Sequence, residues 1–382
     1  MKKIYMDHAA TTPVHPEVFE VMKPFFSEKF GNSASPHSFG REAEQAQEDS
    51  RRTIAKLIGA KPEEIYFTSG GTESDNLAIK GTAFTKKDEG NHIITSKIEH
   101  HAILHPCEWL EKQGFEVTYL PVDKYGFINP KDVEEAIRKD TVLVSIMHAN
   151  NEIGTIEPIE KIGKICKKND VYFHTDAVQT VGKIPINLKN IDILSASAHK
   201  LYGPKGIGFI YIKNGIKIEP WQHGGGHEKG MRSGTENVAG MVGFAKACEI
   251  AKKNMRSETK RLSSLRDKIV KEVLELKDSW LNGHPKERLP GNAHFCFRFI
   301  EGESLILLLD QKGIAASTGS ACSSKSLEPS HVLTAIGLKP EEAHGSLRIT
   351  LGKDNKEEDV DYLLENLPGI VEKLRKISPL KK

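Results

Sequence analysis

The chain is poor in cysteine, in long apolar runs and in net charge, and each shortage excludes a class of protein. Its five cysteines are widely scattered without CxxC pairs, which excludes a disulfide framework and indicates reduced thiols in the cytoplasm. No apolar run approaches the roughly 20 residues of a membrane span, and Asp7 places an acid too early for a signal peptide. With a formal net charge of +2, the chain lacks a basic footprint for nucleic acid. We therefore expect neither a membrane nor a nucleic acid as a partner.

Short β-rich runs alternate with helical patterns through the first two-thirds of the chain. The expected strands cover Glu64–Phe67, His92–Thr95, Glu116–Leu120, Val142–Ile146 and Val171–His174. Helices are expected over Arg41–Ile58, Glu73–Phe84, Ala102–Gln113, Lys131–Lys139 and Pro158–Lys168. Alternation of this kind, with nearly uniformly apolar strands, predicts an α/β fold with a mostly parallel sheet.

The pattern changes near residue 250, and we expect a domain boundary near residue 255. A long amphipathic helix is predicted over Ser257–Leu276, followed by the alternating strand His294–Phe299, in which Cys296 faces away from the phenylalanines. A further strand, Ser346–Leu351, and a closing helix, Lys356–Ile377, complete this part of the chain. It is predicted to form a smaller α+β domain.

Lys200 lies at the start of a turn, after the strand end Asp192–Ser197 and before a second apolar strand. A lysine there sits on a rigid element and can face a cavity, which suits a covalent anchor whose amine must be partly desolvated. The alternative is a solvated loop lysine. The flanking Ser197 and His199, and Asp176 on a separate strand, favour the functional interpretation.

The segment Thr68–Glu73 follows a strand and opens a helix. Unpaired backbone N–H groups and a hydroxyl at such a helix start can hold a phosphate, because the donors and the helix dipole both favour an anion. The alternative is a capped helix start with Ser69 or Thr72 as the N-cap. The pattern is neither Walker A nor GxGxxG, so ATP and NAD are poorly supported.

Polar groups follow other strands at corresponding positions. Asp176 ends one strand, with Gln179 close behind, and an aspartate there can hold a protonated ring nitrogen or form a structural ion pair. His100 and Asn151 follow two further strands, although a lone histidine is more often packed or capping. Together with Lys200 and the helix start, these clusters describe a pyridoxal phosphate site with a covalent anchor, a pyridinium partner, a ring stacker and a phosphate cradle.

Cys322 differs from the other cysteines in its neighbourhood. The segment Ser317–Ser326 has almost no side chain able to pack, which is the setting of a reactive thiol. Cys107, Cys166 and Cys248 have apolar neighbours and are predicted to be buried. The alternative for Cys322 is a loop cysteine of no consequence.

The chain resembles the NifS/IscS-like cysteine desulfurases over essentially its whole length. The motifs that carry the resemblance are YMDHAATTP at 5–13, TSGGTESDN at 68–76, EH at 99–100, NNEIG at 150–154, HTDAVQ at 174–179, the lysine stretch at 195–208, HGGGHE at 223–228, MRSGT at 231–235 and TGSAC at 318–322. The resemblance implies a fold-type I, pyridoxal phosphate-dependent homodimer. It also implies a large cofactor-binding domain over residues 16–255 and a small domain formed by residues 1–15 and 256–382.

The resemblance further implies conversion of L-cysteine to L-alanine with a persulfide left on Cys322. Sulfur would then pass to an acceptor, either an iron–sulfur scaffold protein or a protein of tRNA thiolation. No resident metal is expected, although Cys322 could transiently ligate an iron–sulfur cluster. The resemblance implies that Lys200 binds the cofactor covalently, that Asp176 pairs with the ring nitrogen and that His100 stacks on the ring face. It places Asn151 and Gln179 near the ring oxygen and the substrate, and Asn32 and Arg348 on the substrate. The implied phosphate ligands are Gly71, Thr72, Ser197 and His199, together with Thr235 of the partner subunit.

Two positions depart from the family pattern, and three other functions stay open. Ser33 follows Asn32 where relatives often have proline, and Gly71 stands where many have alanine. A selenocysteine lyase would share every cofactor residue. An aminotransferase or another lyase of the same cofactor would not need Cys322. A non-catalytic scaffold for sulfur-acceptor proteins would not need Lys200.

Overall fold

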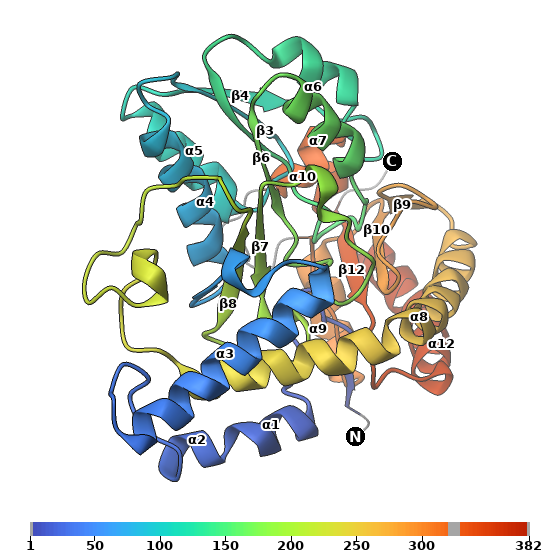
Figure 1. Ribbon diagram of the computed structural model, residues 1–382. Coiled ribbons are helices and arrows are strands. Elements are labelled where there is room, and N and C mark those ends of the chain that lie inside the picture. Colours follow the sequence, from blue (N-terminus) through green and yellow to red (C-terminus); the bar gives the residue numbers. More distant parts are fainter. Residues whose placement is uncertain (1–2, 320–328, 380–382) are drawn as a thin grey trace.

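The computed structural model describes residues 3–319 and 329–379. Its largest element is a seven-stranded sheet in the order β2-β8-β7-β6-β5-β3-β4 (Figure 1). The strands are β2 (Ile65–Thr68), β3 (His92–Ser96), β4 (Glu116–Leu120), β5 (Thr141–Ser145), β6 (Tyr172–Asp176), β7 (Ile193–Ser197) and β8 (Gly208–Ile212). Within the described chain β8 alone runs antiparallel to its neighbours, and the other pairs are parallel. The predicted α/β fold with a mostly parallel sheet is confirmed.

Helices cover both faces of this sheet. They are α3 (Ser38–Ile58), α4 (Gly71–Thr85), α5 (His101–Glu111), α6 (Pro130–Ala136), α7 (Ile159–Lys168) and the first half of α8 (Val238–Leu274). One core cluster joins Ile54 of α3 and Phe244 of α8 to Val144 of β5. Another joins Ile103 of α5 to Leu143 of the same strand. Because neighbouring strand residues point to opposite faces, β5 is buried on both sides, as its continuous apolar sequence predicts.

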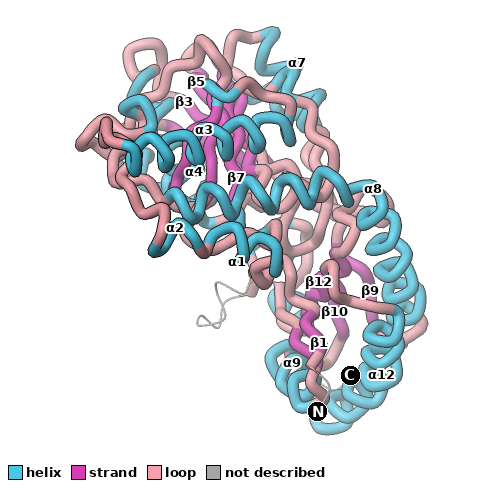
Figure 2. The backbone as a smooth tube through the Cα atoms, turned by 60° about the horizontal axis from the view of Figure 1, so that its bottom comes forward, coloured by secondary structure: helices cyan, strands magenta, loops and turns pink. Residues whose placement is uncertain are grey.

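A smaller body is built on a second, antiparallel sheet in the order β12-β10-β9 (Figure 2). It contains β9 (Ser279–Asn282), β10 (Asn292–Phe297), β12 (Ser346–Thr350), α9 (Gly302–Gln311) and α12 (Glu357–Ile377). Phe295 and Phe297 of β10 pack in the core of this body. Cys296 packs in a different cluster, so the prediction that it faces away from the phenylalanines is confirmed.

The helix α8 connects the two bodies (Figure 2). The separate helix predicted over Ser257–Leu276 is wrong, because it is the second half of this 37-residue helix. Met241 packs in the large core, whereas Ile269 and Val273 pack in the small one. The periodicity changes near residue 255 because the helix changes partners there, and no helix breaker marks the change. The predicted domain boundary therefore lies inside one continuous helix.

The N-terminal strand β1 (Ile4–Tyr5) pairs with β11 (Ile314–Ala315), and Ile4 and Met6 lie in the core of the small body. The chain then runs from residue 7 to residue 12 toward the turn between β7 and β8. The remaining helices are α1 (Pro16–Met22), α2 (Pro24–Ser27), α10 (His331–Ala335) and α11 (Pro340–Ala343). Among the described residues, no helix has both the length and the apolar character required to cross a bilayer.

Candidate active site

Lys200 is presented by the turn between β7 and β8. β7 ends at Ser197, and one 3-10 turn over Ala198–Lys200 follows it. The Nζ atom of Lys200 donates hydrogen bonds to Ala9 O at 2.6 Å and to Ala10 O at 2.7 Å. The predicted anchor lysine is thus held against the N-terminal segment, which sequence reasoning did not place beside it.

Asp176 is the last residue of β6, the parallel neighbour of β7. Its Oδ1 accepts a hydrogen bond from Val178 N at 2.8 Å. Burial raises the pKa of Asp176 to about 6, although the positive charge of Lys200 opposes the rise. Burial and the charge of Asp176 also raise the pKa of the adjacent Asp75. A buried carboxylate beside a second acid is stabilised by a cation, and a protonated ring nitrogen is such a group.

His100 caps the start of α5. Its Nδ1 accepts a hydrogen bond from Ala102 N at 3.1 Å, which fixes the orientation of the ring. Burial and the positive charge of Lys200 lower the pKa of His100 to about 4. The imidazole is therefore neutral at physiological pH, as a group that stacks on an aromatic ring and exchanges a proton should be. This capping contact of His100 is compatible with the functional role predicted for the residue.

A polar pocket of about 410 Å³ lies at the N-terminus of α4. Its lining includes Gly71, Thr72, Ser197, His199 and Lys205, together with Thr11 and Ser69. The backbone N–H groups of the first helical turn, two nitrogen side chains and hydroxyl groups make it an anion site. The predicted phosphate residues of this chain are therefore brought together.

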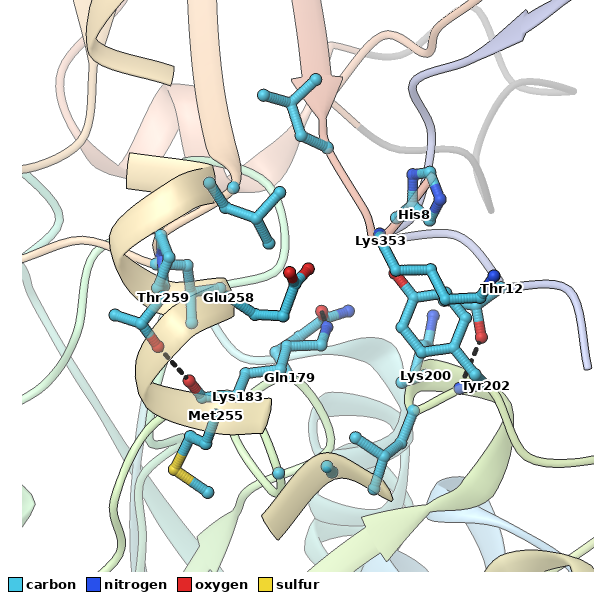
Figure 3. Close-up of a pocket in the computed structure, with 18 of the residues that line it drawn as sticks. His8, Thr12, Gln179, Lys183, Lys200, Tyr202, Met255, Glu258, Thr259 and Lys353 are labelled. Atoms are coloured by element: carbon cyan, nitrogen blue, oxygen red, sulfur yellow. Dashed lines mark hydrogen bonds between the residues drawn. The ribbon is translucent and has the colours of Figure 1, made fainter. Parts of the chain in front are cut away.

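Gln179 lies beside Lys200 on a second, more apolar cavity of about 210 Å³ (Figure 3). Its Nε2 donates a hydrogen bond to Ala9 O at 3.0 Å, the same carbonyl that accepts from Lys200. Two predicted residues, Gln179 and Lys200, therefore donate to the same carbonyl of the N-terminal segment.

Arg348 of β12 is 2% exposed, although the sequence predicts that it clamps a substrate carboxylate. One terminal nitrogen donates to Asn151 O at 3.2 Å and Gly319 O at 3.1 Å, and the other donates to Asp7 Oδ1 at 2.9 Å. The Nε atom is buried and has no hydrogen-bond partner in the described structure. A buried, unpaired guanidinium N–H is the feature expected of a carboxylate site.

Three predicted residues lie apart from this cluster or beyond the described chain. Asn32 is in an exposed loop, where its Oδ1 accepts a hydrogen bond from Ala34 N at 2.9 Å. Thr235 is exposed in the segment that extends from the body beyond β8 (Figure 1), and it lies outside the lining of the described phosphate pocket. Cys322 falls within residues 320–328, outside the described residues.

Sequence reasoning missed three residues that the fold brings to the site. Thr11 Oγ1 lies 3.1 Å from His199 Nδ1, Lys205 lines the phosphate pocket, and Asp7 pairs with Arg348. Asp7 and Thr11 belong to a motif of the resemblance, but nothing local shows that this segment crosses the site. Within the described ranges, no group of three or more His, Cys, Asp or Glu is arranged to hold a metal ion.

The fold and these residues define the class of protein as a pyridoxal 5′-phosphate-dependent enzyme of fold-type I. Residues 4–363 match the family described as aminotransferase class-V, and the chain belongs to that family as a cysteine desulfurase of the IscS type. The buried acid Asp176, the anion pocket and Lys200 fit the ring nitrogen, the phosphate and the aldehyde of this cofactor. The class of enzyme follows from the residues of the site, whereas the family follows from the match over nearly the whole chain.

Relatives match the chain over all or nearly all of its length. The chain is 59% identical to the cysteine desulfurase IscS of Dictyoglomus turgidum, covering 100% of this chain and 97% of the relative. It is 57% identical to the IscS of Methanosarcina thermophila, covering 99% and 94%. Among solved structures it resembles a NifS-like protein at a TM-score of 0.92 and 42% identity, covering 98% of this chain and 100% of the other. A structure described as SspA in complex with cysteine matches at a TM-score of 0.82 and 40% identity, covering 91% and 99%.

Proposed function

We propose that the chain converts L-cysteine to L-alanine and transfers the sulfur to Cys322 as a persulfide. The observation that carries the proposal is the convergence of Lys200, Asp176 and the α4 anion pocket at one edge of the sheet. Cysteine desulfurases more than half identical to the chain over its full length support the choice of reaction.

Each group around the cofactor site has a physical role that suits this reaction. Bound pyridoxal phosphate supplies an electron sink for negative charge at the substrate Cα. Asp176 would hold the ring nitrogen in its protonated form, and the neutral amine of Lys200 would remove the Cα proton. His100, which is neutral, stacks on the ring, and Gln179 donates to its oxygen. Gly71 and Thr72 bind the phosphate with Ser197 and His199.

Arg348 orients the substrate through its carboxylate. Its unpaired Nε and a terminal nitrogen provide the fork that a carboxylate binds. Asn151, whose carbonyl holds the same guanidinium, lies beside the clamp. Asn32, which is exposed in this chain, completes the substrate site in the assembled enzyme.

Cys322 is the sulfur acceptor. Its thiolate attacks the substrate sulfur, an S–S bond forms as the Cβ–S bond breaks, and the carbon fragment takes up the electron pair and a proton to become alanine. Gly319, just before the undescribed segment, is held by Arg348, and Ser330, just after it, donates to Glu152 Oε2 at 2.6 Å. These contacts support the role, because both flanks of the segment lie next to the substrate clamp.

We also propose that the active enzyme is a homodimer in the cytoplasm. Phe19, Phe26, Phe30 and Phe39 each expose more than half of their surface, which favours an apolar contact with a second copy. Thr235, exposed here, then joins the phosphate site of the partner. Cys107, Cys166, Cys248 and Cys296 are free thiols, as in a reducing compartment. The persulfide passes to an iron–sulfur scaffold protein or another sulfur acceptor.

The variant Cys322→Ser tests this function. It should still shift the cofactor absorbance when L-cysteine is added, because the thiol acts only after the substrate has bound, but it should produce almost no alanine. The matched control, Cys248→Ser, changes a buried cysteine away from the site and should retain turnover apart from a loss of packing. Lys200→Ala should lose the visible absorbance of the lysine-bound cofactor. Alanine formed by Cys322→Ser at the wild-type rate would contradict the proposal and favour a lyase or an aminotransferase.

A further inference from the structure

Lys183 is a half-buried lysine for which the reaction above has no role. It lies at the end of the turns that follow β6, four residues after Gln179. Its Nζ donates a hydrogen bond to Gln179 Oε1 at 3.2 Å, and its carbonyl accepts one from Thr259 Oγ1 at 3.0 Å. Figure 3 shows Gln179 between Lys183 and Lys200 on the wall of the 210 Å³ cavity. Lys183 is therefore one side chain away from the cofactor lysine.

The contacts determine how the Gln179 amide is oriented. An ammonium group has three donors and no acceptor, so it can bind only the oxygen of an amide. On the other side, Ala9 O can accept only from the amide NH₂ group. With its oxygen held by Lys183, Gln179 presents its NH₂ group to Ala9 O, the carbonyl that also accepts from Lys200. If the amide were flipped, its NH₂ group would face the Lys183 ammonium, which is also a donor, and its oxygen would face Ala9 O, which is also an acceptor.

The charge of Lys183 acts on the same site. Burial and the charge of Lys200 lower the pKa of Lys183 to about 7, so the two lysines repel each other when both are protonated. The other titratable groups on the walls of this cavity are His8, His15, Lys200, Tyr202, Glu258 and Lys353. Glu258, the acid among them, is paired with Arg261. Removing the Lys183 ammonium should therefore make Lys200 and the group it carries easier to protonate.

We propose that Lys183 is a positioning residue for the cofactor, which acts by holding the Gln179 oxygen so that the amide NH₂ group stays on the Ala9 side, where it can donate to the cofactor ring oxygen. This inference rests on the proposed function, because Gln179 serves the ring oxygen only if the cofactor is bound at Lys200. Lys183 itself touches neither the cofactor nor the substrate. Its removal should change the protonation of the lysine-bound cofactor before it changes folding.

The test is a pH titration of the visible absorbance of the holoenzyme without substrate. Lys183→Met keeps the length of the side chain but removes the donor and the charge. Both losses favour protonation of the lysine-bound cofactor, so the midpoint of its titration should rise by about one pH unit. Retention of the cofactor on dialysis should also fall. Lys183→Arg keeps the charge and donors and should restore the wild-type midpoint.

A matched control separates positioning from packing. Thr259→Val removes the hydrogen bond to the Lys183 carbonyl and leaves the ammonium group in place, so its midpoint should equal that of the wild type. In a Gln179→Met background, Lys183→Met should shift the midpoint less than it does alone, because the residue acts through Gln179. If Lys183→Met is too unstable to purify, Lys183→Gln removes the same charge and should shift the midpoint in the same direction.

Two outcomes would overturn the inference. One is a wild-type midpoint in Lys183→Met or its substitute Lys183→Gln, and the other is an equal shift in Thr259→Val, which would indicate packing alone. These results differ from failure of the proposed function. A wild-type protein without visible absorbance would contradict the cofactor role of Lys200, whereas a normal wild-type spectrum with an unchanged variant contradicts only the role of Lys183.

Discussion

At the scale of single residues, Lys200 influences the ionisation of several groups around it. Its charge lowers the pKa values of His100, His199 and Lys183, in addition to the effect of their burial. Burial, opposed by the charge of Lys200, raises the pKa of Asp176. The site thus contains nitrogen groups that release protons easily around the buried acid Asp176. This arrangement suits a reaction in which a proton must move between a lysine and a substrate carbon.

The departure at residue 71 also has a local cause. A Cβ atom added to Gly71 would lie 2.7 Å from Val178 Cγ2, closer than side chains pack. Glycine at the first position of α4 therefore leaves room for the side chain of Val178, two residues after Asp176. The departure preserves the backbone N–H groups that the phosphate needs, and it removes no functional group.

Arg348→Lys tests the substrate clamp at the residue scale. Lysine keeps the positive charge and can still pair with Asp7, but it lacks the planar fork that binds a carboxylate in two places. We expect the KM for L-cysteine to rise about tenfold or more, equivalent to about 1.4 kcal/mol of lost binding. The absorbance of the bound cofactor should stay unchanged.

Steady-state kinetics with a parallel spectrum make this measurement. Arg298→Lys is the matched control, because Arg298 forms an exposed ion pair with Glu342 away from the site. A wild-type KM in Arg348→Lys would show that the buried guanidinium has a structural role only.

At the scale of elements, the segment that carries Thr235 is anchored by a buried ion pair. Glu228, in a short 3-10 turn of this segment, receives hydrogen bonds from Arg51 of α3 at 2.8 and 2.9 Å. Gln47 and Phe67 N donate to the same carboxylate. The carboxylate joins the segment to α3 and β2, and it compensates the charge of a buried arginine.

Glu228→Gln should weaken this anchor strongly. The amide NH₂ group would face donors and leave the Arg51 charge uncompensated, which costs about 3 kcal/mol of unfolding free energy. Denaturant unfolding of the purified protein measures the loss. The control Glu48→Gln changes the partly exposed acid on the same arginine and should cost about 1 kcal/mol or less. Equal losses in the two variants would contradict the importance of the anchor.

At the scale of the whole molecule, two of the predicted site residues lie apart from the described pockets of the single chain. Thr235 and Asn32 lie in exposed segments, and exposed phenylalanines lie on α1, α2, the segment before α3 and the first turn of α3. The proposed dimer would use these surfaces and supply Thr235 to the phosphate of the partner. The two sites would then depend on each other.

Mixed dimers test this dependence. A subunit with Thr235→Val keeps its own Lys200, and a subunit with Lys200→Ala keeps its own Thr235. If Thr235 acts across the interface, a dimer of the two has one complete site, whereas either variant alone has none. Cofactor binding measured by absorbance should therefore recover one tight site per mixed dimer. No recovery would mean that Thr235 acts within its own subunit or not at all.

Much of the fold and part of the site could be predicted from the sequence, because their signals are local. Apolar runs such as β5 identify buried parallel strands, and polar residues directly after strands identify the sheet edge where Lys200 and Asp176 meet. The buried state of Cys107, Cys166 and Cys248 also followed from their neighbours. These features depend on residues a few positions apart, which one stretch of sequence contains.

Only the tertiary structure decided the rest, because those contacts join residues far apart in the chain. The hydrogen bonds of Lys200 to Ala9 and Ala10 cross 191 and 190 positions, and the pairing of Arg348 with Asp7 crosses 341. The continuity of α8 was hidden because one helix packs in two cores, so its apolar stripe changes direction without a break in the backbone. The sequence by itself determined which chemical groups stand at the strand ends. Packing of the N-terminal segment across the sheet determined which partners hold those groups and how their charges act on one another.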